Sequence, residues 1–387
     1  MHGTVAGGRI RLLYVTPPSE HFAGIERVVH EIAATLATDF GREFDVHVLH
    51  CKSYQELAAT EIPYQLHVTP AGKLRDLLGV LRAFLRRHSF DIIVCPQVEP
   101  SMICWLAARL SGSRVLLVPH LHGNPRIEER QSLRSRALFM AFRWLVSRSV
   151  PEVFAVSPSL AAFAQRHLAP KRPVRFVPNP ARVYDGIDTT ARPVDAPVFL
   201  CIARLCEQKG QDVLLKAFAR VREKVPSASL LLVGSGPDER KLRALAGELQ
   251  LGDSVTFAGY QPDLERYFPL ARIFVLPSRW DGFALVMLDA LNFGLPLVVT
   301  NCDFGARDLV TDQRLGRVVR VDDADDLAAA MLASLADDRS DEIVRFRRQT
   351  AASYAPRKVT AKHARALREI VLASSSVRIP VQDRGGP

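Results

Sequence analysis

The sequence predicts two doubly wound α/β domains in tandem, and three observations support this fold class. The chain has 387 residues, and domains of about 150 to 200 residues are typical, so two cores fit better than one. Short apolar runs alternate with amphipathic helical stretches along most of it. A stretch rich in Pro and Asp at 184–197 interrupts the alternation, which then starts again. Strands that alternate with helices predict a parallel sheet in each half.

The first half opens with the apolar run at 9–15, which stops at two prolines; apolar positions at helical spacing follow from Ile25. This order predicts a strand, a loop and a helix. A long helix is expected over 73–88. Further strands are expected at 44–50, 90–95, 114–120, 152–157 and 174–179. We therefore expect a first domain at 1–183, followed by a linker at 184–197.

The second half repeats the pattern and predicts a domain over 198–355. Its first helix, expected over 211–225, carries one apolar stripe suited to a sheet. Later helices are expected from about Phe283 to Phe293 and over 323–338. Strands are expected at 197–204, 229–236, 254–259, 272–278 and 296–301. A last helix over 356–374 is expected to pack back toward the first domain, ahead of a frayed polar tail at 375–387.

The charge balance predicts an anionic partner. The chain has 51 Lys and Arg against 41 Asp and Glu, a net charge of +10. Residues 1–190 hold 23 of the basic and 16 of the acidic residues, so most of the excess lies in the first domain. The helix over 73–88 combines leucines with arginines in a pattern that suits an anionic membrane surface. Alternatively, its leucines cover the sheet and its arginines form a solvated edge.

Cysteine usage and hydropathy predict a cytoplasmic protein. The six cysteines form no C-x-x-C pair, and a chain of this size does not need disulfides. The most apolar helical segment, 137–150, is interrupted by Arg143 and Arg148, and a membrane span needs about 20 apolar residues. Arg9 and Arg11 stand at the start of the first apolar run, which is short and therefore resembles a strand more than a signal peptide. Peripheral contact with the inner face of the cytoplasmic membrane stays open.

The strongest cluster of candidate site residues lies at 277–291, PSRWDGFALVMLDAL. A strand is expected to end at Ser278 and a helix to begin near Gly282 or Phe283. The first amides of such a helix are unpaired and can hold a phosphate. Asp281 stands at the helix entrance and Asp289 about two turns inside. Alternatively, Asp281 is an N-cap and Asp289 a solvated helix residue.

A second cluster, ARLCEQKG at 203–210, follows the first strand of the second domain. Arg204 and Lys209 both fall in a short loop between strand and helix. A guanidinium and an ammonium in such a loop can bind one diphosphate together. The alternative is a solvated loop with ordinary surface charges.

Two loops of the first domain carry further candidates. Gly24 stands at a helix entry, where a small residue lets the backbone approach a ligand, although a tight turn explains it equally. His120 and His122 end a strand, and imidazoles there can bond substrate hydroxyls or accept protons. A structural role is the alternative, and a metal site is not expected because no carboxylate or cysteine accompanies them at ligand spacing.

In the second domain, Gly234 and Gly236 match a dinucleotide fingerprint poorly.

Together these motifs resemble the retaining glycosyltransferases of family 4, whose GT-B fold has two Rossmann-like domains facing across a cleft. The resemblance covers nearly the whole chain. Its most specific parts are ARLCEQKG at 203–210, LLLVGSGP at 230–237, VTFAGY at 255–260 and PSRWDGFALVMLDA at 277–290.

The resemblance implies a role for each matching residue. The diphosphate-binding pair falls on Arg204 and Lys209, and the two carboxylates of the E-x7-E motif fall on Asp281 and Asp289. Asp281 would contact a sugar hydroxyl and Asp289 the ribose. His122 would lie beside the donor sugar. Further donor contacts fall on the first-domain loop at Ala23 and Gly24, and on Tyr260, Gly282, Phe283, Ala284 and Leu285.

The sequence departs from the family pattern at two points. Both carboxylates of the E-x7-E pair are Asp here, one methylene shorter, so their contacts need closer approach or a bridging water. Ala23 replaces a usual Gly. A non-catalytic member is therefore one alternative.

The activity implied by the resemblance is retaining transfer of a sugar from a nucleotide-sugar donor to a hydroxyl acceptor, in lipopolysaccharide, capsule or other surface-polysaccharide synthesis. Neither a divalent metal nor a cofactor is expected, since the nucleotide sugar is a substrate. The acceptor is expected to be a glycan or a lipid-linked molecule. A sugar-nucleotide epimerase of the same fold and a silent donor-binding subunit remain alternatives. Nucleic acid is not expected as a partner, because no RNA- or DNA-binding signature appears.

Overall fold

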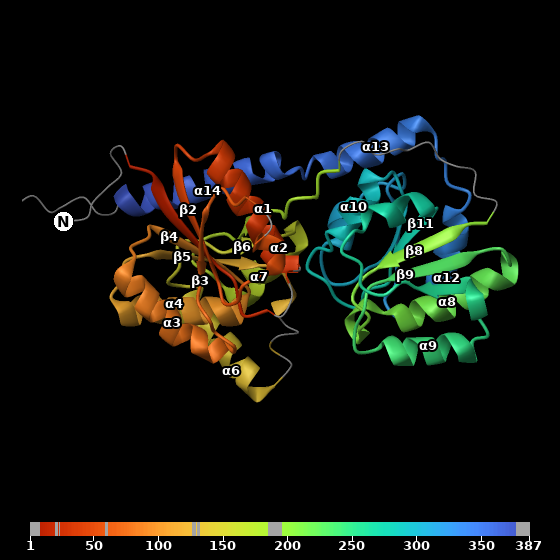
Figure 1. Ribbon diagram of the computed structural model, residues 1–387, viewed down its shortest axis with the longest axis horizontal. Coiled ribbons are helices and arrows are strands. Elements are labelled where there is room, and N and C mark those ends of the chain that lie inside the picture. Colours follow the sequence, from red (N-terminus) through yellow and green to blue (C-terminus); the bar gives the residue numbers. More distant parts are fainter. Residues whose placement is uncertain are drawn as a thin grey trace, which may run out of the picture. The chain divides into compact units, whose positions relative to one another are not determined.

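The computed structural model describes residues 8–19, 22, 24–58, 61–125, 129, 132–184 and 196–376, and it divides the chain into two compact units. Unit 1 comprises Met1–Val156, Ala161–Pro180 and Pro356–Pro387, and unit 2 comprises Ser157–Leu160 and Ala181–Ala355. Each unit contains one sheet with parallel strand pairs and helices packed on it (Figure 1). This confirms the predicted fold class. Most of the predicted linker and the end of the predicted tail, 185–195 and 377–387, lie outside the described residues.

The sheet of unit 1 has the order β3-β2-β1-β4-β5-β6-β7, so the direction of strand addition reverses between β1 and β4. The strands are β1 (Ile10–Val15), β2 (Phe44–His50), β3 (Gln65–Val68), β4 (Ile92–Pro96), β5 (Leu116–Leu121), β6 (Phe154–Ala155) and β7 (Arg175–Phe176). The helices are α1 (Gly24–Asp39), α2 (Gln55–Ala58), α3 (Leu74–Arg87), α4 (Val98–Ser111), α6 (Leu133–Ala141), the π-helical turn η1 (Phe142–Val146), α7 (Pro158–Leu168) and α14 (Pro356–Ser376). Only β3 among these strands had no counterpart in the sequence prediction.

The sheet of unit 2 has the order β10-β9-β8-β11-β12-β13, which reverses between β8 and β11. Its strands are β8 (Val198–Ile202), β9 (Ser229–Val233), β10 (Val255–Phe257), β11 (Ile273–Leu276), β12 (Leu297–Thr300) and β13 (Gly316–Val319). Its longer helices are α8 (Gln211–Lys224), α9 (Glu239–Glu248), α10 (Val286–Asn292), α12 (Ala324–Ser334) and α13 (Asp341–Ala352), and the short ones are η2 (Glu207–Lys209), η3 (Gly252–Ser254), η4 (Glu265–Leu270) and α11 (Ala306–Leu309). The apolar stripe predicted on α8 is buried in the core of this unit.

Helix α14 belongs to unit 1, although it follows unit 2 in the sequence. It packs on α1, and the Nε2 atom of His363 lies 2.9 Å from the hydroxyl of Tyr14 on β1. Arg368 of the same helix pairs with Glu43. The chain therefore returns to its first sheet at its C-terminal end.

Helix α3 shows which alternative holds for the leucine- and arginine-rich stretch at 73–88. Leu77, Leu81 and Leu85 are buried, whereas Arg75 and Arg86 are exposed. The leucines therefore cover the sheet, which supports the alternative of a solvated basic edge. Among the described helices, none has a run both long and apolar enough to cross a membrane.

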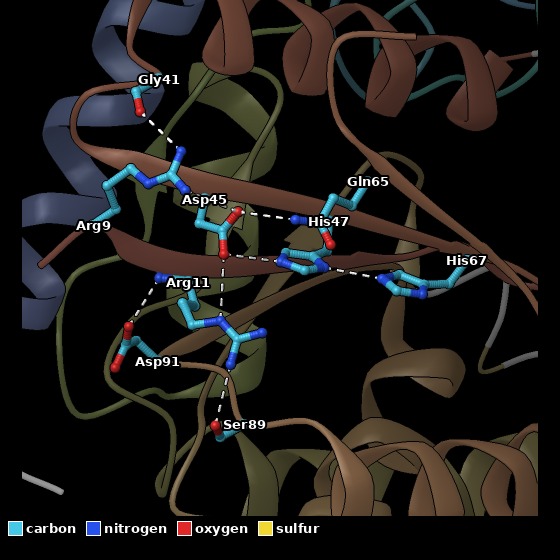
Figure 2. A network of polar contacts seen from close by, with 9 residues as sticks. All are labelled: Arg9, Arg11, Gly41, Asp45, His47, Gln65, His67, Ser89 and Asp91. Atoms are coloured by element: carbon cyan, nitrogen blue, oxygen red, sulfur yellow. Dashed lines mark hydrogen bonds and ion pairs between the residues drawn. The ribbon is translucent and has the colours of Figure 1, made fainter.

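A polar network crosses the first three strands of unit 1 (Figure 2). His47 on β2 lies between Asp45, at 3.2 Å from its Nε2 atom, and His67 on β3, at 2.9 Å from its Nδ1 atom. Arg11 on β1 lies 3.4 Å from the same carboxylate. Because a carboxylate only accepts, His47 donates from Nε2, and its Nδ1 atom then accepts from His67. The network gives partners to polar atoms that the sheet buries.

All eleven histidines of the chain lie in unit 1, and burial acts on many of them. It lowers the pKa of His50 and that of His120 to about 4. It lowers the pKa of others as well, namely His30, His47, His67, His122 and His363. These imidazoles are therefore neutral at neutral pH.

We predict that acid destabilises unit 1 well above the pH at which carboxylates protonate. Between about pH 6.5 and 4 the unfolded chain binds protons that the folded imidazoles do not, so the free energy of unfolding falls as the pH falls. A shift of this size corresponds to about 3 kcal/mol for each of His50 and His120 at full effect. Urea unfolding at pH 7.5 and at pH 5.0 measures this loss of unfolding free energy. His120→Asn should reduce the loss, and an equal loss in the variant would contradict the assignment.

Candidate functional site

The loops that follow β8 and β11 meet at the point where the strand order of unit 2 reverses. These two strands are neighbours in the sheet, with Ile273 opposite Phe199. In open parallel sheets, the carboxyl ends of the strands at such a point form the usual ligand-binding crevice. The sequence clusters at 203–210 and 277–291 occupy these two loops.

Lys209 and Asp281 are in direct contact across this point. The Nζ atom of Lys209 lies 2.6 Å from Oδ2 of Asp281, and both side chains are mostly shielded, at 17% and 15% exposure. Ser278, itself buried, donates a hydrogen bond to the same carboxylate oxygen at 2.9 Å. Two residues that are 72 positions apart in the sequence thus form one charged pair.

The electrostatics keep Lys209 charged. Burial acts to lower the pKa of its ammonium, but the charge and the hydrogen bond of Asp281 outweigh burial and raise that pKa above its usual value. A protonated ammonium is what an anionic ligand requires here.

Backbone and amide contacts fix the two loops against each other. The side chain of Gln208 donates to the carbonyl of Trp280 at 3.0 Å, and the amide of Arg279 donates to the carbonyl of Gln208 at 2.8 Å. Arg279 also reaches the carbonyl of Glu207 and forms a two-pronged ion pair with Asp212 at the start of α8. Sequence reasoning gave Arg279 no role, although it belongs to the motif at 277–291.

Two glycines permit the close approach of these loops. Gly210 has φ +65°, and a Cβ atom there would lie 2.2 Å from the carbonyl oxygen of Pro277. Gly305, with φ +85°, brings the loop after β12 against Gly282, where a Cβ would lie 2.7 Å from the carbonyl oxygen. Any larger residue would clash with backbone and adopt a disfavoured φ.

Asp289 is buried on α10, so the alternative of a solvated residue is wrong. It is 3% exposed, and within the described part of the chain its Oδ1 atom has no hydrogen-bond partner. Burial raises the pKa of this carboxyl to about 6, although the charge of Arg182 and the hydroxyl of Tyr184 act in the opposite direction. A shielded carboxylate with an unused acceptor atom suits binding to hydroxyl groups.

The helix that carries Asp289 begins later than predicted. We expected its first residue near Gly282 or Phe283, but α10 begins at Val286. Gly282, Phe283, Ala284 and Leu285 form an irregular loop ahead of it. Phe283 is buried and stacks on Tyr354, with ring centroids 5.5 Å apart, so packing holds this segment out of the helix. Its amides are part of the loop and not of the helix N-terminus.

The remaining candidates of unit 2 lie on loops at the same edge of the sheet. Arg204 is exposed, and within the described part of the chain no carboxylate pairs with it. Its carbonyl accepts a hydrogen bond from Gln211 at 3.0 Å. Tyr260 follows β10 and is 67% exposed.

The candidates of unit 1 follow β1 and β5. Gly24 begins α1 with φ +30°, whereas Ala23 lies outside the described residues. His122 is half-buried, and its ring centroid lies 4.3 Å from that of His120. Burial, with the neighbouring His120 and His363, holds the pKa of His122 well below its usual value. His122 is thus a neutral imidazole that resists protonation and can accept a hydrogen bond.

Known protein families match both parts of the chain. The family model for glycosyl transferases group 1 matches residues 187–352, and that for glycosyltransferase family 4 matches residues 22–183. A lipopolysaccharide core biosynthesis glycosyltransferase, LpsE of Rhizobium meliloti, is 32% identical over 77% of this chain and 86% of its own length. The chain belongs to glycosyltransferase family 4.

Two further relatives carry other names. A GDP-mannose-dependent phosphatidylinositol monomannoside mannosyltransferase of Mycobacterium tuberculosis is 33% identical over 66% of this chain and 70% of its own length. An uncharacterized glycosyltransferase of Methanocaldococcus jannaschii is 27% identical, and the match spans 49% of either chain. These names do not agree on one substrate for the relatives of this chain.

Solved structures show the same GT-B fold. The lipopolysaccharide outer core galactosyltransferase WaaB matches with a TM-score of 0.72 at 17% identity, over 93% of this chain and 99% of that one. Anabaena HepE in complex with UDP-glucose matches with a TM-score of 0.76 at 18% identity, over 93% and 100%. At such identities the likeness establishes the fold alone.

We predict that Asp289→Asn stabilises the protein at pH 7.5. A folded-state pKa raised from 3.8 to about 6 means that the folded state binds a proton more readily, so the stability contribution is greatest below pH 3.8 and falls as the pH rises through 6. By this shift, ionising the Asp289 carboxyl in the folded state lowers the free energy of unfolding by about 3 kcal/mol. Chemical unfolding should show the variant more stable by about 1 to 3 kcal/mol at pH 7.5. Equal stabilities at pH 7.5 would contradict this cost.

Proposed function

We propose that this family 4 enzyme transfers a sugar from a nucleoside-diphosphate donor to a hydroxyl acceptor with retention of anomeric configuration, in the synthesis of a lipopolysaccharide, capsule or other surface polysaccharide. The observation that carries the proposal is the Lys209–Asp281 pair at the strand-order reversal of unit 2, with Arg204 exposed on the same loop. A relative named for lipopolysaccharide core synthesis supports the acceptor class.

The cations act on the leaving group. As the bond between the sugar C1 atom and the diphosphate oxygen breaks, negative charge builds up on the diphosphate. Lys209 neutralises it with a point charge and Arg204 with a planar fork, and the loop amides at Phe283 and Ala284 donate hydrogen bonds. Removing one preorganised donor of this kind costs about 3 to 4 kcal/mol in other enzymes. No metal ion is needed in this scheme.

The new bond forms on the face from which the diphosphate leaves. The acceptor oxygen bonds to C1, and its proton passes to the departing phosphate oxygen, so no carboxylate nucleophile takes part. His122, a neutral imidazole, accepts a hydrogen bond from a sugar hydroxyl. Asp281 holds Lys209 and contacts a second hydroxyl. Tyr260, Gly282, Leu285 and Gly24 supply further donor contacts.

We predict that Lys209→Ala and Arg204→Ala each lower turnover at least about tenfold, or 1.4 kcal/mol, because the diphosphate loses a cation. Donors are screened by product mass, and turnover is then measured with the accepted donor. Lys224→Ala, an exposed lysine at the end of α8, is the matched control. Turnover like that of wild type in both site variants would remove these residues from the mechanism.

We predict that nucleotide affinity falls in acid with an apparent pKa near that of Asp289, about 6. Only the ionised carboxylate accepts hydrogen bonds from both ribose hydroxyls, and protonation converts one oxygen to a donor. Calorimetry with UDP and GDP between pH 5 and 8 measures the affinity, with Asp289→Asn as the reference that should lack this step. A pH-independent affinity in wild type would count against the ribose contact.

The products of the reaction distinguish transfer from the alternatives. Incubating donor without acceptor yields an isomerised nucleotide sugar only if the chain is an epimerase. Nucleotide binding without turnover across a broad acceptor panel would instead indicate a donor-binding subunit. Nuclear magnetic resonance of the product reports the anomeric configuration, and inversion would contradict the proposed mechanism.

A further inference from the structure

Unit 1 carries an apolar helix face that its own core does not cover. On α6 and η1, Phe139, Phe142 and Val146 point into the core. On the other side, Leu133 is 81% exposed and Trp144 is 52% exposed. We call the exposed set, Leu133, Ala137, Met140, Trp144 and Leu145, the α6–η1 face.

The spacing shows that this face is continuous. Positions 133, 137, 140 and 144 recur at intervals of four, three and four residues, which places them in one stripe along a helix. Leu145 stands next to the stripe, in the π-helical turn that ends the element. Single exposed apolar residues are ordinary, as at Leu270 in unit 2, but a stripe of this kind marks an interaction surface.

Arginines surround the face. The sequence from 131 to 151 holds four of them, Arg134, Arg136, Arg143 and Arg148, and no Asp or Glu. Two stand over the indole of Trp144, with Arg148 at 4.6 Å and Arg143 at 5.7 Å from the ring centroid. Within the described part of the chain, the carboxylate that pairs with this group is Glu99, 3.6 Å from Arg134.

The neighbouring helix α4 adds further exposed apolar residues beside this face. Helix α4 packs against both α6 and η1, and α6 stands beside it in Figure 1. Leu106 and Leu110 on α4 are also exposed. Trp105 donates a hydrogen bond to Ser149 at 2.8 Å and lies under Arg109, so the two elements are tied together. Helix α4 therefore supports the α6–η1 face and adds exposed apolar residues beside it.

We propose that the α6–η1 face seats this glycosyltransferase on an anionic lipid surface. A tryptophan, aliphatic side chains and arginines on one helix face are the chemistry of the interface between headgroups and acyl chains. The basic charge selects anionic lipid and disfavours a second copy of this chain, which would bring the same arginines. Helix α3 offers no comparable apolar face, because three of its five leucines are buried and the other two, Leu74 and Leu78, are half-buried.

The inference deepens the proposed function, since a lipid-linked acceptor lies at such a surface, but its test does not depend on transfer. Flotation with phosphatidylcholine vesicles, with and without phosphatidylglycerol, measures binding directly. We expect binding that requires phosphatidylglycerol and weakens with salt. The double variant Met140→Ser/Trp144→Ser should bind at least about tenfold more weakly, or 1.4 kcal/mol. Leu270→Ser, which removes an exposed leucine from unit 2, should bind like wild type.

A second set of variants removes charges and leaves the residues of the apolar stripe in place. Replacing Arg136, Arg143 and Arg148 by Gln should weaken binding by about fivefold for each arginine. The matched control is Arg75→Gln/Arg86→Gln/Arg87→Gln on α3, which should change binding less. The apolar variant and the arginine variant alter different side chains. If one of them misfolds, the other still tests the proposal. Circular dichroism checks the fold of each.

The fluorescence of Trp144 offers a further test, because tryptophan emission depends on the polarity around the indole. The chain has three tryptophans. Comparing wild type with Trp144→Phe isolates the contribution of Trp144 to the fluorescence emission. On anionic vesicles the emission should shift to shorter wavelength, and lipids brominated on the acyl chains should quench it. Both effects should be clearly smaller in Trp144→Phe than in wild type.

Three results would overturn the proposal: equal binding to neutral and anionic vesicles, binding unaffected by both sets of variants, or a dimer in sedimentation that Trp144→Ser abolishes. Vesicle binding without any transfer would instead be a failure of the proposed function. Transfer to a soluble acceptor without vesicle binding would be a failure of this inference.

Discussion

The ion pair between Lys209 and Asp281 organises the candidate site of unit 2. It joins the loops after two neighbouring strands at the point where the strand order reverses. Ser278 fixes the carboxylate, while Gln208 and Arg279 fix the backbones that carry the pair. The pair also raises the pKa of the lysine against the effect of burial. The lysine therefore stays protonated in a shielded position, as binding of an anionic ligand requires.

Much of this arrangement follows from the sequence. Alternating apolar runs and helices predicted both sheets, and the residue types at 203–210 and 277–291 predicted an anion site. The contact between Lys209 and Asp281 was beyond spacing arguments, because it depends on which strands are neighbours in the sheet. Arg182 and Tyr184, which act on Asp289, lie just before the predicted linker and at its first position, and neither belongs to a recognisable motif.

The errors have physical causes. Strands β3 and β13 have four residues each. No residue of β3 is buried and only two of β13 are, so neither strand needs a continuous apolar run. Phe283 and Ala284 are apolar and suited to a helix, but Phe283 packs on Tyr354 and α10 begins later. The solvated alternative for Asp289 failed because residues 287–291 of this short helix are all buried. Such burial depends on tertiary packing.

The central claim is that the loops joined by Lys209 and Asp281 bind the diphosphate of the donor. Hydrogen–deuterium exchange tests it most directly, by comparing UDP and GDP with uridine and guanosine. The account predicts that the diphosphates slow exchange in 203–210 and 277–285, and that the nucleosides lacking phosphate do not. Slowed exchange confined to other segments, or equal protection by the nucleosides, would contradict it.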